Sequence, residues 1–424
     1  MPNGFSEADH QASRLARRRR SPTETGTIRI GYASGSRTHQ RDFAQAAPAL
    51  ARVLRERPSC RLVLFRANDS KEPVVNPDEF ECLERVRAQI EWRDLVSIEE
   101  LPAELARFDI NLAPLEPGNP FCEAKSELKF FEAALVEVCT VASPTGPMRR
   151  VIRHGENGML ADSESEWYRA LTDLVDDPPR RQRLAHAAYL EVLWPFSPAR
   201  RAELIRSVLG QLNGGAEAAR GFELELRRSD GNARTGGGPQ AISLPDTELI
   251  FAADQLEAAE ATVIIPLYNY ADFVIEALES VRAQTVSPLD LIVVDDASTD
   301  RSLQAAADWA RAHANRFNRI AVLRNRANAG VAMTRNAGFD TAETPYVLPL
   351  DADNRLLPRC VEVCLAAIKR SKGAFAYPAI RCFGGSEEVR GDLPFVPMRL
   401  AGGNYIDAMA LVAKWAWAAV GGYQ

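Results

Sequence analysis

The sequence predicts an α/β protein with two open, largely parallel sheets. Three observations support this prediction. Short apolar runs alternate with helical patterns, a polar, glycine-rich stretch interrupts that alternation, and the 424-residue chain is too long for one ordinary core. We therefore expect one domain over residues 27–212 and a second over residues 261–424. A flexible linker over residues 213–260 would join them, after a linker-like basic N-terminus over residues 1–26.

Residues 27–212 contain apolar runs with the length of buried strands. Residues 27–33 (TIRIGYA) predict the first strand, and residues 43–55 predict a helix with apolar side chains on one face. Strands that alternate with helices favour parallel pairing through crossover helices. Further strands are predicted at residues 61–65, 109–114 and 138–142.

The stretch from residue 213 to residue 260 has a different composition. Several glycines stand among polar residues, so little apolar surface is available for burial. An amphipathic piece at residues 249–259 is expected to pack as a helix before the next domain.

Residues 261–424 resume the alternation of strands and helices. Leu357, Val361, Cys364 and Ile368 are spaced like one face of a helix, which makes Cys364 a core residue rather than a metal ligand. Another helix is predicted where Val274, Leu278 and Val281 recur. Strands are predicted at residues 261–266, 291–294, 320–323 and 346–350.

Composition argues against several classes of protein. The net charge of −6 and the pI of about 5.6 argue against a general nucleic-acid binder. The seven scattered cysteines indicate reduced thiols of a cytosolic protein, without a disulfide framework or a zinc site. No apolar run reaches the roughly 18–20 residues of a membrane span, and a secretory signal is not expected. The run from Arg17 to Arg20 is interpreted as a solvated cluster, with an anionic membrane or nucleic acid as the alternative contact.

Two predicted strands of the second domain end in acidic residues. Asp295 and Asp296 follow one strand, and Asp351 and Asp353 follow another. Ligands of open α/β sheets bind beyond the carboxyl ends of strands, and side chains two apart on an extended segment point the same way. Two converging carboxylates repel unless a cation relieves them, and Mg²⁺ or Mn²⁺ suits such oxygen ligands. The alternative for Asp353 is a solvated turn in which it caps the next helix. The alternative for the other pair is that Asp296 or Ser298 caps a helix that begins at Thr299.

Four stretches of the second domain follow one another in a specific order. They are residues 263–269 (VIIPLYN), 293–300 (VVDDASTD), 328–338 (NAGVAMTRNAG) and 350–353 (LDAD). In this order and spacing they resemble the family 2 glycosyltransferases, which have the GT-A fold. The resemblance covers residues 261–424.

This resemblance implies a role for seven residues. In the family, the matching positions bind the base (Pro266 and Tyr268), the base and ribose (Asp295 and Asp296), the nucleotide (Arg335), and Mg²⁺ or Mn²⁺ with the donor diphosphate (Asp351 and Asp353). Sugar transfer expels a nucleoside diphosphate, and a divalent cation stabilises the charge that develops on it. The family inverts the anomeric centre through in-line attack by an acceptor hydroxyl.

The family's general base is an Asp that typically follows a Gly-Gly-aromatic turn. Here residues 421–424 (GGYQ) are the last of the sequence, and residues 402–405 with an apolar helix expected over residues 406–420 would form the approach on the acceptor side. We therefore expect the catalytic base to be absent from a C-terminally incomplete GT-A domain. Losing such a base typically costs roughly 10²–10⁴-fold in rate, so the chain is expected to bind donor but to transfer sugar poorly.

The first domain carries a second resemblance. Residues 119–135, 138–143 and 154–160 (HGENGML), with residues 27–42 ahead of them, resemble the donor-binding half of GT-B glycosyltransferases of a family 4 type. Together the two resemblances imply two Rossmann-like nucleotide-sugar-binding domains, a GT-B C-terminal half followed by a GT-A domain. Residues 1–5 resemble the segment between the two halves of GT-B enzymes, so the acceptor half is expected to be missing.

Five residues of the first domain are candidates for donor binding. Gly35 and Ser36 offer backbone N–H groups to phosphate, and Arg37 and Lys125 carry positive charge for the diphosphate. In the family, the carboxylate at the position of Glu132 holds the donor ribose.

The glutamates of this stretch depart from the family pattern. The family's two glutamates lie eight positions apart, whereas Glu123 and Glu132 lie nine apart and Ala124 occupies the first position. The alternative for Glu123, Glu127 and Glu132 is a solvated helix face.

The function expected from these observations is transfer of a sugar from a nucleotide-diphosphate donor, of UDP type, to a hydroxyl acceptor. The acceptor would be a glycan or lipid-linked molecule in cell-surface polysaccharide synthesis, and the chain would be cytoplasmic, peripheral to the inner face of the membrane. A catalytically impaired nucleotide-sugar-binding fragment is the alternative. An NAD-dependent oxidoreductase is disfavoured because no G-x-G-x-x-G follows residues 27–33, and a hydrolase because no G-x-S-x-G occurs.

Overall fold

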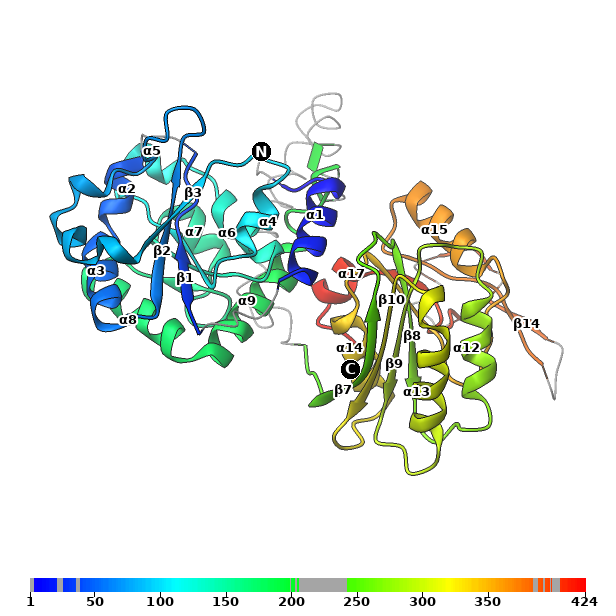
Figure 1. The fold of residues 1–424 in the computed structure, drawn as a ribbon. Helices are drawn as coiled ribbons and strands as arrows, with labels where there is room; N and C mark the ends of the chain where they lie inside the picture. Colours follow the sequence, from blue (N-terminus) through cyan, green and yellow to red (C-terminus); the bar gives the residue numbers. More distant parts are fainter. Residues whose placement is uncertain are drawn as a thin grey trace, which may run out of the picture. The chain divides into compact units, whose positions relative to one another are not determined.

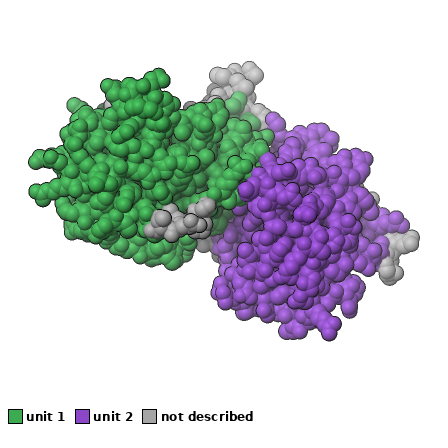
Figure 2. Space-filling model, in the orientation of Figure 1, with its two compact units in different colours: residues 1–207 green, residues 208–424 purple. Residues whose placement is uncertain are grey.

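The computed structural model divides the chain into two compact units, residues 1–207 and residues 208–424, which are coloured separately in Figure 2. It describes residues 4–20, 26–35, 39–198, 200–202, 204–205, 242–383, 388–391, 393–396, 398 and 405–424. Each unit has its own sheet and its own buried core, in agreement with the predicted α/β class.

Unit 1 is built on a six-stranded sheet in the order β3-β2-β1-β4-β5-β6, with all neighbouring strands parallel (Figure 1). The strands are β1 (Ile28–Gly31), β2 (Cys60–Arg66), β3 (Ile90–Asp94), β4 (Ile110–Ala113), β5 (Cys139–Ala142) and β6 (Met159–Leu160). The four predicted strands of this unit are confirmed as β1, β2, β4 and β5. The sequence did not reveal β3, whose residues are all partly or fully exposed, or β6, which is only two residues long.

Helices connect these strands, as parallel pairing requires. The helices of unit 1 are α1 (Glu7–Arg18), α2 (Gln40–Ala44), α3 (Ala47–Glu56), α4 (Leu101–Leu105), α5 (Pro120–Glu123), α6 (Leu128–Leu135), α7 (Gly146–Val151), α8 (Glu164–Asp176) and α9 (Pro178–Val192), with 3₁₀ turns at Pro77–Glu79 and Glu81–Gln89. The helix predicted over residues 43–55 is divided between α2 and α3. Pro48 lies in the first turn of α3, where the missing N–H costs no helical hydrogen bond.

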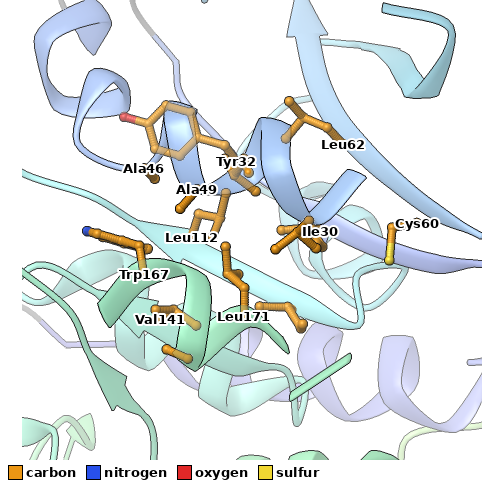
Figure 3. Close-up of a cluster of buried hydrophobic side chains, with 14 of the residues drawn as sticks. Ile30, Tyr32, Ala46, Ala49, Cys60, Leu62, Leu112, Val141, Trp167 and Leu171 are labelled. Carbon is orange, nitrogen blue, oxygen red and sulfur yellow. The ribbon is translucent and has the colours of Figure 1, made fainter. Parts of the chain in front are cut away.

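The core of unit 1 forms where apolar strand residues meet α3 and α8. Figure 3 shows Ile30, Leu62 and Leu112 of the sheet gathered with Trp167 and Leu171 of α8. All five side chains are fully buried. Strands covered by helices in this way read as continuous apolar runs, which is why the sequence predicted them.

The N-terminal segment differs from the predicted linker, because residues 7–18 form α1. Ser6 and Asp9 make a reciprocal capping box at its start, with N···O distances of 3.1 and 2.8 Å. The interpretation of the basic run as solvated is wrong for Arg17, whose side chain is only 10% exposed, whereas Arg20 is exposed. Arg17 donates to the Glu137 carboxylate at 3.0 Å, and Arg20 donates to a backbone carbonyl at 2.8 Å.

Unit 2 is built on a seven-stranded mixed sheet in the order β12-β15-β11-β8-β9-β10-β7. The strands β8 (Ala261–Leu267), β9 (Asp290–Asp295), β10 (Arg319–Asn325) and β11 (Tyr346–Pro349) are parallel and confirm the four predicted strands. Antiparallel strands β7 (Thr247–Asp254), β12 (Phe375–Ala376) and β15 (Leu411–Ala413) complete the sheet. A separate pair consists of β13 (Ile380–Arg381) and β14 (Val389–Arg390).

The helices of unit 2 include the two that the sequence predicted by spacing. They are α12 (Val274–Arg282), α13 (Ser302–His313), α14 (Val331–Thr341), α15 (Cys360–Ser371) and α17 (Lys414–Ala419), with a 3₁₀ turn at Ala314–Arg316. Val361, Cys364 and Ile368 are buried on α15, so the assignment of Cys364 to the core is confirmed. Leu357 precedes the helix and is 76% exposed, contrary to the prediction. Over the part of the chain that the structure describes, no helix has the length and apolar character needed to cross a bilayer.

Two helices predicted for unit 2 are not helices over the predicted residues. The helix predicted within the linker is instead strand β7, which pairs along β10 and packs Ile250 and Phe251 against the core. The helix predicted over residues 406–420 is divided into β15 and α17. In both places pairing with a neighbouring strand outweighs the local helical pattern, because the open edge of a sheet leaves backbone groups to be paired.

Candidate functional site

The acidic residues of unit 2 lie at one edge of its sheet. Asp295 is the last residue of β9, and Asp296 donates its backbone N–H to the Leu267 carbonyl at the end of β8, at 2.7 Å. Asp351 lies two residues beyond β11, which pairs with β8 in parallel. The carboxyl ends of β8, β9 and β11 therefore bring these side chains to the region where ligands of open α/β sheets bind.

The Asp296 carboxylate is occupied by the protein itself. It is buried, and it accepts hydrogen bonds from Asn325 Nδ2 at 2.7 Å and from the backbone N–H groups of Ala329 and Gly330 at 2.8 Å each. Gly330 has a φ of +85°, a conformation that favours glycine. Asp296 thus holds the loop that leads into α14. The alternative role as a helix cap is wrong, because Asp300 accepts from the Ser302 N–H at the start of α13.

Asp295 is fully buried next to it. One oxygen accepts the Ser298 N–H at 3.0 Å, and the other has no hydrogen-bond partner among the residues that the structure describes. Burial raises the pKa of the Asp295 carboxyl, while the hydrogen bonds from Ser298 oppose that rise. A buried carboxylate oxygen without a donor is costly in a protein interior and marks a position of functional interest.

Hydrogen bonds of Asn269 with Ser298 and Thr299, here called the strap, join the loop after β8 to the loop after β9. Asn269, with a φ of +57°, accepts the Thr299 N–H at 2.8 Å and donates its own N–H to Ser298 Oγ at 3.0 Å. Pro266 and Tyr268 lie just before this strap, and Tyr268 remains 43% exposed. Sequence reasoning quoted Asn269 within a motif without giving it a role. An Asn followed by a polar turn is a signal for such side-chain to backbone bonds.

Asp351 forms an ion pair with Arg335 of α14. Arg335 Nη2 lies 2.7 Å from Asp351 Oδ1, and the side chains are 14% and 35% exposed. The segment is a turn, closed by the Asn354 N–H donating to the Asp351 carbonyl at 2.9 Å. The argument from side chains two apart on an extended segment therefore does not apply to Asp351 and Asp353.

The carboxylate oxygens at this turn nevertheless suit a hard divalent cation as ligands. Asp353 is exposed, and Asp351 is accessible on one side, so carboxylate oxygens of both can be reached from solvent. No group of three or more His, Cys, Asp or Glu side chains that could hold a metal occurs within the described ranges. A site with one or two carboxylates and phosphate oxygens is the usual arrangement for Mg²⁺. The alternative of Asp353 as a helix cap is wrong, since α15 begins at Cys360 without a side-chain cap.

The Gly-Gly-aromatic turn is fixed to α14 by Asn336. Asn336 Oδ1 accepts the Tyr423 N–H at 2.7 Å and Trp417 Nε1–H at 3.0 Å, and its Nδ2 donates to the Tyr423 carbonyl at 2.8 Å. Gly422 has a φ of +80°, and a Cβ there would lie 2.7 Å from Asn336. The Tyr423 ring centroid lies 5.7 Å from the Arg335 guanidinium carbon. Burial raises the pKa of the Tyr423 hydroxyl.

Unit 1 contains a cavity of about 460 Å³ at the carboxyl ends of β1 and β4. Its lining includes Gly35, Lys125 and Glu132, which the sequence predicted, and also His39 and Lys129, which it did not. Ser36 and Arg37 lie outside the described residues.

Lys125 is already paired within this cavity. Its ammonium lies 2.6 Å from Asp42 Oδ2, and the same oxygen lies 2.8 Å from His39 Nδ1. Burial alone would raise the pKa of the Asp42 carboxyl, but hydrogen bonds from His39, Lys125 and Cys122 hold it well below its usual range. Asp42 was missed because two of its partners, Cys122 and Lys125, lie 80 and 83 residues away in the sequence.

Lys129 and Glu132 carry shifted pKa values on the wall of the cavity. Burial lowers the pKa of Lys129, whose ammonium donates to the Ala33 carbonyl, to about 8. Burial raises the pKa of Glu132 to about 7, against the opposing charge of Lys129. Both groups therefore titrate near neutral pH.

The alternative of a solvated helix face is wrong for Glu127, which is buried, and for Glu132, which is partly buried, whereas Glu123 is exposed. Glu123 accepts the Gly146 N–H at the start of α7 at 2.7 Å and the Gly118 N–H at 3.3 Å, and Glu127 is buried. Glu123 therefore holds backbone, as the shifted spacing allows. The turn at residues 154–160 is held by buried Asn157, which accepts the Arg153 N–H at 2.7 Å.

A different family model matches part of each unit. Residues 262–408 match the model of "Glycosyl transferase family 2", and residues 28–177 match that of "Glycosyl transferases group 1". The first match includes the Asp295–Asp296 edge and Asp351, and the second includes the lining of the unit 1 cavity.

Curated relatives match over a short part of their length. The uncharacterized glycosyltransferase YibD of Escherichia coli is 36% identical over 104 residues, 24% of this chain and 29% of that protein. The teichoic acid poly(glycerol phosphate) polymerase of Staphylococcus epidermidis is 30% identical over 27% of this chain and 16% of its own length. The hyaluronan synthase of Pasteurella multocida is 31% identical over 26% of this chain and 11% of its own. The chain thus spans less than a third of the length of each of these three.

Solved structures give more distant likenesses. Staphylococcus aureus TarS (residues 1–349), solved with UDP-GlcNAc, is 22% identical with a TM-score of 0.30 over 37% of this chain and 46% of that one. Anabaena HepE, solved with UDP and glucose, is 16% identical with a TM-score of 0.39 over 49% of this chain and 55% of that one. The assignment rests on the family matches: residues 262–408 are a family 2 glycosyltransferase domain, and residues 28–177 are a group 1 glycosyltransferase domain.

Proposed function

We propose that the chain is a glycosyltransferase that transfers a sugar from a nucleotide-diphosphate donor to a hydroxyl acceptor. The observation that carries this proposal is the pairing of Arg335 with Asp351 beyond the carboxyl end of β11, at the same sheet edge as Asp295 at the end of β9. This edge lies within the family 2 match. An arginine next to carboxylates at a sheet edge suits a diphosphate that arrives with a divalent ion.

For the nucleoside, we propose contacts from Pro266, Tyr268, Asp295 and Asp296. Tyr268 offers an exposed aromatic ring for a base, and Asp295 has a carboxylate oxygen without a protein partner among the described residues. Asp296 would contribute through the loop that it holds, since its oxygens already accept three hydrogen bonds.

For the diphosphate, we propose that Asp351 and Asp353 hold Mg²⁺ or Mn²⁺. When bound, the ion supplies charge stabilisation to the departing nucleoside diphosphate. Arg335 places a second positive charge at the same position and can hydrogen-bond phosphate oxygens through its fork of N–H groups. No general base is assigned to a residue of this chain.

For unit 1, we propose a second donor-type site in the cavity of about 460 Å³. Lys125 would neutralise a diphosphate, and Glu132 would hold a ribose. The cavity lining supports this proposal, because it combines those two side chains with the strand end at Gly35.

The proposed biological setting is synthesis of a cell-surface polysaccharide or glycan from a UDP-type donor. The names of the teichoic acid polymerase and hyaluronan synthase relatives support that setting. The acceptor would be a glycan or lipid-linked molecule, and the chain would be cytoplasmic and reach the inner face of the membrane through that acceptor.

The first prediction tests the metal site. Asp353→Ala is expected to abolish Mn²⁺-dependent binding of UDP, because the ion loses one of two protein carboxylates. Isothermal titration with UDP and Mn²⁺ measures this, and Asp308→Ala, a 60% exposed carboxylate of α13, is the matched control. UDP binding by Asp353→Ala at wild-type strength would count against the site. A parallel transfer assay separates an enzyme from the alternative, a nucleotide-sugar-binding protein, which would bind without transfer.

A further inference from the structure

Arg335 is a cation already in place at the aspartate proposed to hold the metal. Its Nη2 lies 2.7 Å from Asp351 Oδ1, and its side chain is only 14% exposed. A charge-assisted hydrogen bond of this length is strong, particularly when it is partly shielded from water. A divalent ion that approaches Asp351 therefore meets a carboxylate whose charge is already neutralised.

The surroundings hold Arg335 near Asp351 without saturating its donors. The Tyr423 ring lies 5.7 Å from the guanidinium carbon, and Asn336, the next residue on α14, fixes Tyr423 through hydrogen bonds of 2.7 and 2.8 Å. Arg335 Nε is buried and has no hydrogen-bond partner among the described residues. The guanidinium thus keeps one N–H donor that no described residue uses, and the carboxylate that pairs with it is that of Asp351.

We propose that Arg335 is the resident counter-cation of this site. Without a donor it neutralises Asp351 and opposes metal binding, and when a diphosphate arrives it exchanges the carboxylate for phosphate oxygens and leaves Asp351 to the ion. This inference rests on the proposed function. Its consequence is positive coupling between metal and nucleoside diphosphate: each binds weakly alone, and each strengthens the other by the same factor.

The experiment compares Mn²⁺ alone with Mn²⁺ plus UDP in wild-type protein and Arg335→Met. Free Mn²⁺ is measured by electron paramagnetic resonance, and UDP binding by isothermal titration. Removing the competing charge is expected to tighten binding of Mn²⁺ alone about fivefold. Removing a phosphate ligand is expected to weaken UDP binding in the presence of Mn²⁺ about tenfold. Arg326→Met, which removes a 60% exposed arginine of the same unit, is the control for lost charge.

The opposite signs distinguish a counter-cation from a structural residue. Unchanged or weaker binding of Mn²⁺ to Arg335→Met would overturn the inference, as would Mn²⁺ binding by neither protein. If thermal unfolding shows that Arg335→Met does not fold, Arg335→Lys replaces it. Lysine keeps the positive charge but lacks the paired N–H groups of the guanidinium, so UDP binding is expected to weaken. UDP binding at wild-type strength would overturn the inference. If wild-type protein binds Mn²⁺ but not UDP, the proposed function fails, while the comparison with Mn²⁺ alone still decides the role of Arg335.

Discussion

Asp296 lies at the acidic edge of the sheet, but its oxygens are used inside the protein. The sequence identified it as a ligand candidate because it follows Asp295 at a strand end, and that position is confirmed. Its three hydrogen bonds to Asn325, Ala329 and Gly330 were not predictable. They depend on how a loop that begins 29 residues later in the sequence folds back over β9.

Replacing Asp296 is therefore expected to affect stability first. Asp296→Ala leaves three donors without their acceptor, of which only that of Asn325 is fully buried, and this should lower the free energy of unfolding of unit 2 by about 1–3 kcal/mol. Denaturant unfolding followed by circular dichroism measures this. Asp272→Ala, at an exposed position, is the control. A stable Asp296→Ala protein that has lost only UDP affinity would instead make Asp296 a direct ligand.

We expect the stability of unit 1 to depend on pH because of Glu132. Its pKa of about 7 in the folded protein lies above the ordinary glutamate value, because burial penalises the charged form. The contribution of Glu132 to stability is therefore fully present below pH 4.5 and is lost as the pH rises through 7. Glu132→Gln should gain stability relative to wild type over that range. Thermal unfolding at pH 4.5, 6 and 8 measures the difference, and a difference that stays constant with pH would contradict the shifted pKa.

At the scale of elements, β7 is a strand that the local sequence pattern did not predict. That pattern predicts an amphipathic helix over residues 249–259, whereas pairing along β10 makes residues 247–254 a strand. Phe251 packs against the core and lies under the Arg311 guanidinium, 5.6 Å from its carbon. We expect Phe251→Ala to lower the free energy of unfolding by about 2 kcal/mol, less than a fully buried aromatic would.

Chemical denaturation of unit 2 tests this assignment. Leu249→Ala, two residues earlier and 62% exposed, should change stability by less than about 0.5 kcal/mol. Equal effects of the two substitutions would argue against the orientation of β7.

Strands that are buried on both faces were predicted with nearly correct bounds. Residues 261–266 and 291–294 correspond to β8 and β9 within one residue at each end. Their continuous apolar runs depend little on neighbours. The short strands β12 and β15 were not predictable, because they are defined by pairing with each other and, for β15, with β11.

The sequence named residues of the candidate site but did not predict the contacts between them. The sequence placed Asp351 and Arg335 near the nucleotide, and the structure brings them into an ion pair. The strap from Asn269 to Ser298 and the bonds of Asn336 to Tyr423 join residues 29 and 87 positions apart. No local spacing predicts such contacts, because they arise only when loops of different strands meet at one sheet edge.

At the scale of the whole molecule, each unit has a separate core and a separate candidate site. We therefore expect a fragment of residues 208–424 to fold alone and to bind UDP with Mn²⁺ within about threefold of the full chain. Isothermal titration of the fragment beside the intact protein measures this, with circular dichroism as the control for folding. Loss of binding by a folded fragment would show that unit 1 contributes to the site.

The two ion pairs, Lys125 with Asp42 and Arg335 with Asp351, bear on selectivity among anions. In the proposed sites each basic side chain would exchange its carboxylate for a bound anion, so chloride or acetate would only replace one single negative charge by another. Only an anion with more than one negative charge is attracted to the basic side chain more strongly than the carboxylate that it replaces. We therefore expect both units to ignore the simple salts of the cell and to respond to polyanions.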